Sequence, residues 1–362
     1  MLNKPILIMA GGTGGHIYPA LAVADYLREK GFSLFWLGTS SGLEARVVPE
    51  RGYQLLTINI SGLRGKGLIR WLQAPVVICR GLFQSILILM HIKPAVVLGM
   101  GGFVSGPGGV ASWIMRIPFC IHEQNAIAGM TNRLLAPLAS MVMEAFPNTF
   151  AKRFNAKLTG NPVRAEIRNS ARIHNPVNSG EKWPLRVLVL GGSQGSRKLN
   201  RIIPETLSIM PENIQIDVRH QTGDALYIDT KAIYRNLNHS ARLEAFIEDM
   251  AEAYTWADIV ICRAGAMTIA ELSAVGIPSI LVPYPYAVDD HQTLNARFLT
   301  DAGAAIAIQE RDLTKEYLCR LLCNFSESRK DLETMGECAR SVDKPDATEV
   351  IATLCMEVAH AG

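Results

Sequence analysis

One pattern occurs twice in this chain of 362 residues and sets most of what it can fold into. A short apolar run is followed by a GG-x-x-G loop and then by helical spacing, first over residues 5–27 and again from residue 185 onward. Such an order predicts a buried strand, a tight glycine turn and a helix. The repetition therefore predicts an α/β protein built from two related halves in tandem.

The domain boundary is expected near residues 160–165. A turn-rich passage at 158–163 and a polar segment at 169–184 separate the two halves, and each half is long enough to bury its own core. We expect a first domain at residues 1–163 and a second at 164–343. An apolar-faced helix within residues 344–362 is predicted to cross back onto the first domain.

Glycine or polar clusters follow several predicted strands of the first half. The strand ending near residue 98 is followed by residues 99–109, which are too rich in glycine to predict a helix. The strand at residues 117–121 is followed by His122-Glu123-Gln124-Asn125. Loops at the carboxyl ends of parallel strands share one edge of a sheet, where open α/β sheets bind ligands. These loops therefore predict a single binding cleft.

The second half contains a predicted anion site. Residues 257–262 predict a strand, Arg263 to Ala266 a small-residue loop, and residues 267–275 a helix. The first turn of a helix has unpaired N–H groups and about half a positive charge, so a diphosphate fits there. Thr268 and Glu271 have the spacing of a capping box, but Glu271 is equally placed to hold ribose hydroxyls. The spacing leaves both interpretations open.

Two familiar kinds of site are excluded by the residues present. The first glycine loop, Gly12-x-Gly14-x-x-Ile17, lacks the third glycine of a dinucleotide fingerprint, and the strand at 33–37 is not followed by a ribose-binding acid. A nicotinamide cofactor is therefore not expected. Asp289 and Asp290 are adjacent, and their side chains would point apart on an extended chain, so no metal is predicted either.

Charge is distributed unevenly between the two halves. Residues 1–163 contain fifteen Lys/Arg and six Asp/Glu, a net charge of +9, while the remainder is −6. Residues 51–122 contain no acid at all, and the bases among them are Arg51, Arg64, Lys66, Arg70, Arg80, Lys93 and Arg116. A basic, acid-free region of this kind predicts an anionic partner.

Residues 61–92 combine apolar side chains with bases, which favours an anionic membrane surface over a nucleic acid as that partner. The alternative is a core helix with an exposed basic face. Pro75 predicts two helical pieces here, and the uncharged stretch 94–115 contains too many glycines to span a membrane. The expected membrane patch consists of Ile69, Trp71, Leu72, Phe83, Arg64, Lys66, Arg70 and Arg80.

The seven cysteines lack a CxxC pair and are odd in number. They are expected to be free, buried thiols in a reducing cytoplasm.

Several ordered motifs make the chain resemble one known family across nearly its whole length. They are AGGTGGH at 10–16, ISGLRGKG at 60–67, VVLGMGGFVSGPGG at 96–109, HEQNAIAG at 122–129, GNPVR at 160–164, GGSQGS at 191–196, RAGAMTIAEL at 263–272 and DDHQTLNA at 289–296. With these motifs the sequence resembles the MurG family of glycosyltransferases. The resemblance implies the GT-B fold, in which two Rossmann-like domains face each other across a cleft.

The activity implied by the resemblance is inverting transfer of N-acetylglucosamine from UDP-N-acetylglucosamine. The acceptor would be the muramoyl 4-hydroxyl of lipid I, undecaprenyl-pyrophosphoryl-muramoyl pentapeptide, giving lipid II for peptidoglycan synthesis. Such an enzyme is a peripheral protein on the cytoplasmic side of the inner membrane and needs no cofactor. Two alternatives stay open, namely a GT-B transferase acting on another lipid acceptor and a nucleotide-sugar-binding scaffold without turnover.

The resemblance also implies roles for individual residues. In the second domain the diphosphate, ribose, uracil and sugar of the donor would be held by Ser193, Ala266, Met267, Thr268, Ile269, Ala270, Glu271, Ile247 and Gln292, with Arg164 nearby. In the first domain the donor sugar and acceptor would be reached by Thr13, Gly14, Gly15 and Asn125. Phe103 stands where the family often has tyrosine, so a hydroxyl role is not expected there.

Inverting transfer needs a base for the acceptor hydroxyl and donors for the departing UDP. His16 is the first candidate, because a helix N-terminus favours the neutral imidazole. A packed or capping histidine is the alternative interpretation of His16. Glu123 is the second candidate, and helix N-termini would stabilise the leaving diphosphate.

Overall fold

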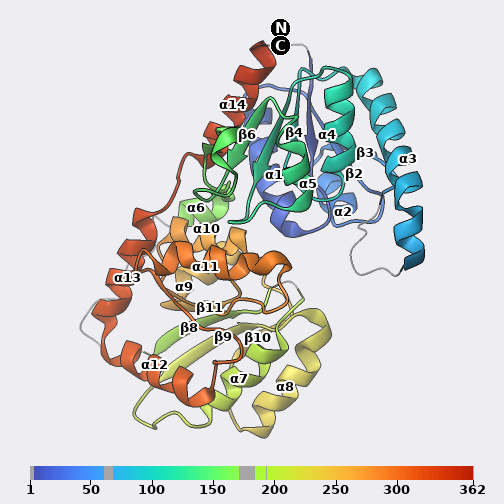
Figure 1. Ribbon diagram of the computed structural model, residues 1–362. Helices are drawn as coiled ribbons and strands as arrows, with labels where there is room; N and C mark the ends of the chain where they lie inside the picture. The colour runs from blue at the N-terminus through green and yellow to red at the C-terminus, as the bar shows by residue number, and fades with distance from the viewer. Residues whose placement is uncertain (1–3, 61–67, 171–183, 193, 362) are drawn as a thin grey trace. The chain divides into compact units, whose positions relative to one another are not determined.

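The computed structural model describes residues 4–60, 68–170, 184–192 and 194–361, with side chains undescribed at 68–73. The chain splits into two compact units (Figure 1). Unit 1 is Met1–Arg164 with Lys344–Gly362, and unit 2 is Ala165–Asp343. The division falls one residue after the expected boundary, and the C-terminal helix belongs to unit 1.

Unit 1 contains a parallel sheet of seven strands in the order β3-β2-β1-β4-β5-β6-β7. β1 pairs with β2 on one side and with β4 on the other, so the strand order reverses between β1 and β4. Ligands of doubly wound sheets bind beyond the carboxyl ends of the strands at such a reversal. The strands are β1 (Ile6–Met9), β2 (Leu34–Gly38), β3 (Gln54–Thr57), β4 (Val96–Gly99), β5 (Phe119–Glu123), β6 (Met141–Glu144) and β7 (Lys157–Leu158).

Helices cover both faces of this sheet. Alternate residues of β1 divide between the two sides, with Ile6 and Ile8 in one buried cluster and Leu7 and Met9 in the other. The first cluster includes side chains from α1 (Gly14–Glu29), α2 (Glu44–Glu50) and α14 (Ala347–Ala361). The second includes side chains from α3 (Leu68–Ile92), α4 (Ser105–Ile114) and α5 (Met130–Leu135). A single-turn 3-10 helix, η1 (Lys152–Phe154), precedes β7.

Two expectations for this unit are wrong. α4 begins at Ser105, inside the segment predicted to be too rich in glycine for a helix. A Cβ at Gly108 would collide with Met9 and one at Gly109 with Leu135, so these glycines allow close packing of the helix. α3 is one helix that contains Pro75 rather than two pieces. A proline removes one helical hydrogen bond, and its ring crowds the carbonyl four residues earlier. The long apolar run that follows packs along α4, and the helix continues through Pro75.

Residues Ala74–Ile92 of α3 have the length and apolar composition of a membrane-spanning helix, with a mean hydropathy of 1.7. A helix that covers the core of a soluble protein can have the same length and composition, so this finding alone assigns no membrane span. Within unit 1 this helix packs along α4, and its inward residues Ser85 and Leu89 are buried. α3 thus covers one face of the sheet, and the side of the helix that faces away from the sheet is strongly apolar.

Unit 2 contains a second parallel sheet of six strands, in the order β10-β9-β8-β11-β12-β13. Its reversal lies between β8 and β11, so the α/β prediction and the repeated plan are confirmed. The strands are β8 (Leu185–Leu190), β9 (Ile216–Gln221), β10 (Arg242–Glu244), β11 (Ile259–Cys262), β12 (Ser279–Leu281) and β13 (Ala305–Ala307). The helices are α6 (Ala165–Ser170), α7 (Arg197–Leu207), α8 (Tyr227–Asn236), α9 (Met250–Trp256), α10 (Ala266–Val275), α11 (His291–Thr300), α12 (Lys315–Glu327) and α13 (Arg329–Ser341), with 3-10 turns η2 (Asp224–Leu226) and η3 (Val288–Asp290).

All seven cysteines are free thiols, as expected. Only Cys120, Cys262 and Cys355 are buried, so the expectation of burial is wrong for the other four. Cys79 is exposed because it lies on the outward side of α3.

Two buried histidines predict that the fold weakens in mild acid. Burial lowers the pKa of His122 to about 4 and that of His220 to about 3. Because both values lie below the ordinary pKa of about 6.5, the unfolded chain binds more protons between pH 6.5 and 4. The free energy of unfolding should therefore fall as pH drops through this window, by up to about 1.4 kcal/mol per pH unit for each group.

Urea unfolding at pH 7, 5.5 and 4.5 measures this loss. A His220→Gln variant, which has no titrating group at that position, should lose less stability over the same range. Equal stability of the wild type at pH 7 and 4.5 would contradict the prediction.

Candidate active site

In unit 1 the loops after β1 and β4 meet where the strand order reverses. Thr13 is the N-cap of α1 with an extended backbone, Gly14 and Gly15 begin the helix, and His16 is its third residue. Gly101, in the loop after β4, has a φ of 96°, and a Cβ there would lie 2.9 Å from His16 Nδ1. Glycine is required at 101 because the backbone turns left-handed and approaches the imidazole closely.

A chain of hydrogen bonds leads from His16 into the core of unit 1. His16 Nδ1 lies 2.8 Å from Gln124 Oε1, and Gln124 Nε2 lies 3.0 Å from His122 Nδ1. His122 Nε2 in turn lies 3.0 Å from the carbonyl oxygen of Gly160. Both His122 and Gln124 are buried. Sequence reasoning placed the polar run 122–125 near the cleft but did not find Gln124 as the partner of His16.

Glu123, the second candidate base, is built into the loop that follows β5. Its Oε1 accepts hydrogen bonds from the Asn125 backbone and side chain, both at 3.1 Å. Its Oε2 accepts from the Gly129 N–H and from Asn132 Nδ2, both at 2.9 Å. Both carboxylate oxygens are thus engaged in holding the loop that contains Asn125.

Glu44 is a site residue that sequence reasoning missed. It is fully buried, its Oε2 accepts from the Gly12 N–H at 3.1 Å, and its Oε1 accepts from the Thr39 hydroxyl at 2.7 Å. The carboxylate therefore fixes the glycine loop ahead of His16. The available signal was helical spacing, because Glu44 shares the inward side of α2 with Val47 and Val48.

Arg164 lies at the end of the first stretch of unit 1. Its guanidinium carbon is 5.4 Å from the centroid of the Tyr18 ring, a cation–π contact that fixes it beside α1.

In unit 2 the loops after β8 and β11 also meet at the reversal of strand order. Gly192 and Gly195 have φ values of 85° and 77°, and a Cβ at Gly195 would collide with the backbone of Thr222. Ser196 caps α7 by accepting from the Leu199 N–H at 3.3 Å. Ser193 lies outside the described residues.

Arg263 connects the two loops of unit 2 and was not singled out as a binding residue from the sequence. One terminal nitrogen donates to Ser196 Oγ at 2.8 Å and to Glu310 Oε2 at 2.5 Å. The guanidinium also lies 5.4 Å from the centroid of the Tyr284 ring. The side chain therefore fixes the turn between β11 and α10 relative to the start of α7.

The expected diphosphate turn is the beginning of α10. Gly265 is its N-cap without a side-chain cap, and Thr268 is already the third helical residue, so the capping-box interpretation is wrong. Ala266, Met267 and Thr268 form the first turn, while the Ile269 N–H donates to the Gly265 carbonyl at 2.9 Å and Ala270 follows.

Glu271 is half-buried in the next turn of α10. Its Oε2 accepts from the Tyr254 hydroxyl at 2.9 Å.

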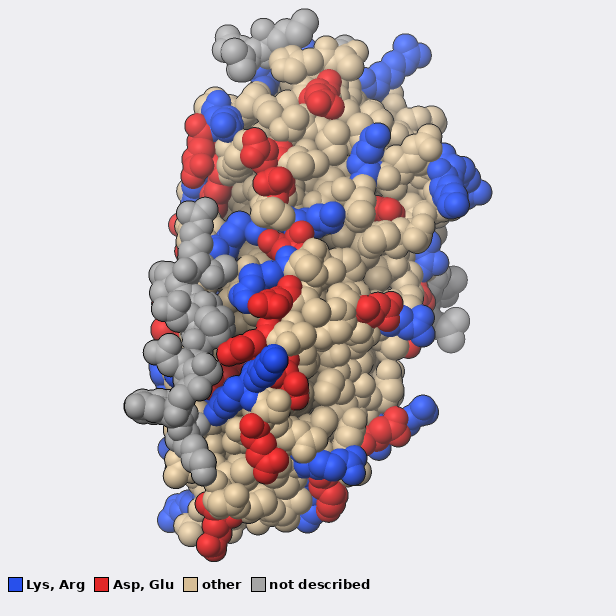
Figure 2. All heavy atoms as spheres, turned by 90° about the vertical axis from the view of Figure 1, so that its left-hand side faces the viewer, with Lys and Arg blue, Asp and Glu red and all other residues tan. Residues whose placement is uncertain are grey.

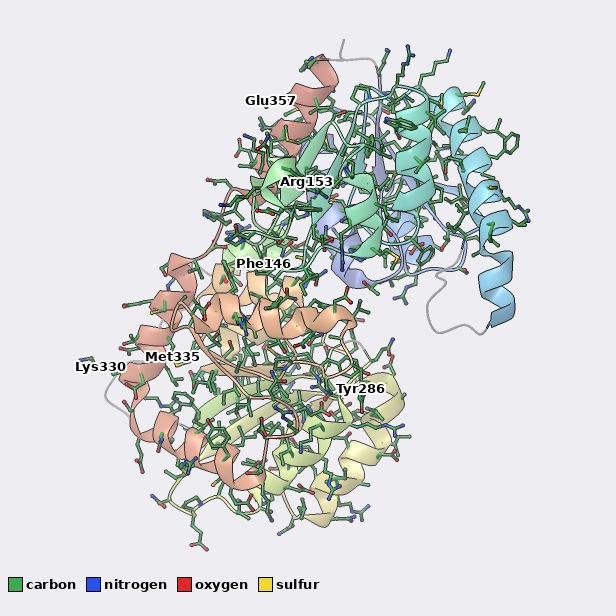
Figure 3. All side chains as sticks on the ribbon, in the orientation of Figure 1. Phe146, Arg153, Tyr286, Lys330, Met335 and Glu357 are labelled. Atoms are coloured by element: carbon green, nitrogen blue, oxygen red, sulfur yellow. The ribbon has the colours of Figure 1, made fainter. Side chains whose placement is uncertain are left out.

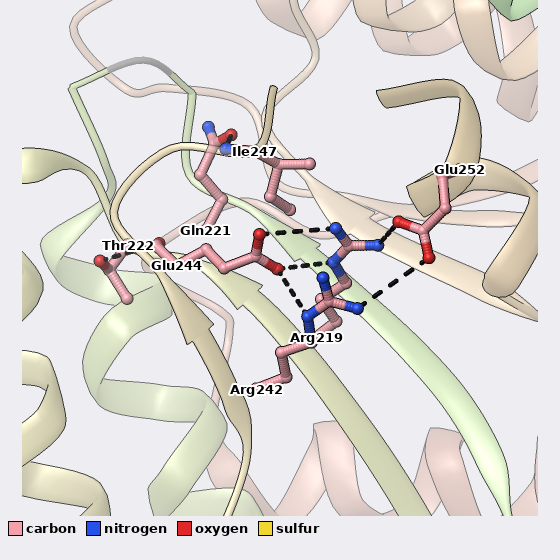
Figure 4. A network of polar contacts seen from close by, with 7 residues as sticks. All are labelled: Arg219, Gln221, Thr222, Arg242, Glu244, Ile247 and Glu252. Carbon is pink, nitrogen blue, oxygen red and sulfur yellow. Dashed lines mark hydrogen bonds and ion pairs between the residues drawn. The ribbon is translucent and has the colours of Figure 1, made fainter. Parts of the chain in front are cut away.

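Gln221, at the end of β9, bridges two loops of this site, and Figure 4 shows it beside Ile247. Its Oε1 accepts from the Ile247 N–H at 3.0 Å, and its Nε2 donates to the Gly192 carbonyl at 3.1 Å. A uracil that used the Ile247 N–H would have to share this hydrogen or displace the amide. Arg219, which is 3% exposed, pairs with Glu244 at 2.7 Å and also with Glu252, fixing the strand that precedes Ile247.

The loop after β12 carries Gln292 and two aromatic side chains. Gln292 Oε1 accepts from the Tyr284 N–H at 2.9 Å. The rings of Tyr284 and Tyr286 pack edge to face with centroids 5.6 Å apart, and Tyr286 is 81% exposed. Tyr286 is labelled in Figure 3. Among the residues that the structure describes, no group of three or more His, Cys, Asp or Glu is placed to hold a metal ion.

Two doubly wound units, each with a glycine loop and a helix start at the reversal of its sheet, match the architecture of the GT-B class of sugar transferases. The chain belongs to glycosyltransferase family 28. The family's N-terminal domain matches residues 6–144 and its C-terminal domain matches residues 186–351.

Two relatives of similar length have the same protein name. The UDP-N-acetylglucosamine--N-acetylmuramyl-(pentapeptide) pyrophosphoryl-undecaprenol N-acetylglucosamine transferase of Marinobacter nauticus is 49% identical over 99% of this chain and 98% of its own. The protein of the same name from Nitrosococcus oceani is 49% identical over 98% of both chains. The crystal structure of Acinetobacter baumannii MurG has a TM-score of 0.81 and 39% identity, covering 98% of this chain and 99% of its own.

Proposed function

We propose that this chain transfers N-acetylglucosamine from UDP-N-acetylglucosamine to the muramoyl 4-hydroxyl of lipid I, giving lipid II for peptidoglycan synthesis. The proposal rests on full-length relatives at 49% identity that carry the name of this transferase. The runner-up is transfer to another lipid acceptor by the same fold.

The donor is proposed to bind at the reversal of the unit 2 sheet. The start of α10 offers backbone N–H groups and a positive dipole to the diphosphate. Gly192 and Gly195 allow the backbone of the opposite loop to come close, and Glu271 presents a carboxylate for the ribose hydroxyls. Ile247 and Gln292 border the same loops and are assigned to uracil and sugar.

His16 is proposed as the base in preference to Glu123. The imidazole is only half-buried, at the beginning of α1, whereas both oxygens of Glu123 already hold the loop after β5. Thr13, Gly14 and Gly15 form the turn around His16, and Asn125 lies in the loop held by Glu123. These residues are assigned to the donor sugar and acceptor.

Transfer of radiolabelled N-acetylglucosamine to two acceptors tests the function. The purified protein should label a lipid I analogue and leave a diacylglycerol acceptor unlabelled. The reverse result would favour the runner-up, and UDP binding without labelling of any acceptor would favour a scaffold.

The helices α3, α4 and α5 are proposed to form the surface that meets the membrane. They cover one face of the unit 1 sheet, and none of their sequences contains Asp or Glu. Among the side chains that the structure describes, their large exposed apolar residues are Val76, Ile78, Phe83, Leu87, Met90, Trp113, Ile114, Met130 and Leu134. On the face drawn in Figure 2, by contrast, acidic and basic side chains are interspersed.

This membrane face extends the patch expected from the sequence. Phe83 and Arg80 are exposed on α3, while the side chains of Ile69, Trp71, Leu72, Arg64, Lys66 and Arg70 lie outside the described part of the chain. Apolar groups can enter the headgroup boundary while each base adds about 1 kcal/mol against anionic lipid. We propose peripheral binding on the cytoplasmic side of the inner membrane, a compartment that also suits seven free thiols.

Phe83→Glu should weaken binding to anionic vesicles at least about tenfold, because one buried aromatic side chain contributes roughly 1.5–3 kcal/mol. Vesicle sedimentation measures this, and transfer to a short-chain soluble acceptor should be unchanged. Ile228→Glu is the matched control, because Ile228 is 79% exposed on α8 of unit 2. Equal loss of binding and soluble transfer in Phe83→Glu would place Phe83 in the fold rather than at the membrane.

A further inference from the structure

The side-chain amide of Gln124 lies between two imidazoles. Its Oε1 is 2.8 Å from His16 Nδ1, and its Nε2 is 3.0 Å from His122 Nδ1. An amide oxygen only accepts hydrogen bonds and an amide nitrogen only donates them, whereas a neutral imidazole has one nitrogen of each kind. The protonation of His16 therefore depends on which way the amide is turned.

The inner end of the chain has only one consistent arrangement of protons. His122 Nε2 faces the Gly160 carbonyl at 3.0 Å and Thr159 Oγ1 at 3.1 Å. The carbonyl has no proton to give, and the Thr159 hydroxyl has two carbonyl acceptors for its own proton, Gly160 at 3.0 Å and Glu144 at 3.4 Å. His122 Nε2 must therefore carry a proton. Because complete burial lowers the pKa of His122 to about 4, the ring is neutral and its Nδ1 accepts.

This arrangement fixes the amide of Gln124. Its nitrogen faces two acceptors, His122 Nδ1 at 3.0 Å and the His122 carbonyl at 3.2 Å. The oxygen must therefore be the atom that faces His16. An oxygen that only accepts requires a proton on His16 Nδ1, which leaves the lone pair of the neutral ring on Nε2.

We propose that Gln124, oriented by His122 and the Gly160 carbonyl, holds His16 in the Nδ1-protonated form, so that Nε2 is the atom that removes the acceptor's proton. This inference rests on the proposed function with His16 as base. Gln124 and His122 are positioning residues, since neither is assigned to contact a substrate.

The proton and electron transfers balance on this assignment. The acceptor's O–H bond breaks and its proton moves to His16 Nε2, while the oxygen's electron pair forms the bond to the anomeric carbon of the donor sugar. The bond from that carbon to the diphosphate breaks, and UDP leaves with the electron pair. The imidazolium that results keeps its Nδ1–H on the Gln124 oxygen, an interaction that strengthens when the ring is charged.

Nitrogen-15 NMR of histidine-labelled protein tests the assignment directly. Correlation of ring nitrogens with carbon-bound protons identifies which nitrogen carries the hydrogen, and the spectrum of His16→Gln identifies the His16 signals. At pH 8 the wild type should show His16 protonated at Nδ1 and His122 protonated at Nε2. A His16 ring protonated at Nε2 would overturn the inference, and this measurement requires no folded Gln124 variant.

Gln124→Met provides the kinetic test, because methionine keeps the length of the side chain but neither accepts nor donates strongly. His16 should shift toward protonation at Nε2, and kcat should fall about 10- to 100-fold because that form presents a proton instead of a lone pair. The KM for UDP-N-acetylglucosamine should stay within about twofold. His122→Phe removes one of the two acceptors of the amide nitrogen and keeps the His122 carbonyl, so it should cause a smaller loss and a mixed population of His16 forms.

Asn161→Ala is the control for simple disturbance of the loop. Asn161 Nδ2 donates to the Gln124 backbone carbonyl at 2.9 Å, so its loss affects the same segment while the side-chain contacts of Gln124 with both imidazoles keep their atoms. This variant should unfold at a lower temperature, and His16 should stay protonated at Nδ1. An unchanged His16 form in Gln124→Met would overturn the inference even if kcat fell. Failure of the wild type to label lipid I would instead refute the proposed function while leaving the NMR result standing.

Discussion

Replacing His16 by alanine should lower kcat for transfer by about 10²- to 10⁴-fold, the usual contribution of a positioned general base. The donor is proposed to bind in unit 2, whereas His16 lies at the start of α1 in unit 1, so binding of UDP should be unchanged. Single-turnover transfer to a lipid I analogue gives the rate, and isothermal titration gives the affinity for UDP.

His239→Ala is the matched control for His16→Ala. His239 is a half-buried histidine between α8 and β10, at the amino ends of the parallel strands and so opposite the loops that follow β8 and β11. The His239→Ala variant should transfer N-acetylglucosamine at the wild-type rate. An undiminished rate in His16→Ala would remove His16 from the role of base, and Glu123 would then be the remaining candidate of the two.

Glu271→Ala should raise the KM for UDP-N-acetylglucosamine by about 10- to 100-fold, because a hydrogen bond to a charged group contributes about 1.5–3 kcal/mol. The carboxylate is half-buried one turn inside α10, where it can meet ribose hydroxyls while the helix start holds the diphosphate. kcat at saturating donor should change little, because the ribose is remote from the reacting carbon. Initial rates at varied donor concentration measure both constants.

Tyr254→Phe separates ribose binding from a purely structural role of Glu271. It removes the hydroxyl that donates to Glu271 at 2.9 Å but leaves the carboxylate in place. The KM should stay near the wild-type value in Tyr254→Phe. If both variants lost only thermal stability, with no change in KM, Glu271 would be a partner of Tyr254 and not a donor ligand.

The strands and their polar ends were predictable from the sequence because parallel strands read as continuous apolar runs. The runs at residues 5–9, 96–98 and 185–190 fall on β1, β4 and β8. The beginning of α10 was also predictable, since Gly265 follows a buried strand and precedes helical spacing. Where local composition misled, tertiary packing decided, as at Gly108 and Gly109 of α4.

Hydrogen bonds between residues that are far apart in the sequence were not predictable in this way. Gln124 is separated from His16 by 108 residues, and Gly12 from Glu44 by 32. Periodicity identifies elements and their buried faces, but it does not show which loop ends come together in space. The hydrogen bonds that orient His16 and the glycine loop therefore emerge only from the folded chain.

The position of the bound nucleotide decides most directly whether unit 2 is the donor-binding unit. A crystal structure with UDP should place the diphosphate at the beginning of α10, opposite Gly192 and Gly195, with ribose oxygens within hydrogen-bonding distance of Glu271. The uracil should lie beside Ile247. Uridine bound in unit 1, or a diphosphate remote from the start of α10, would contradict the account.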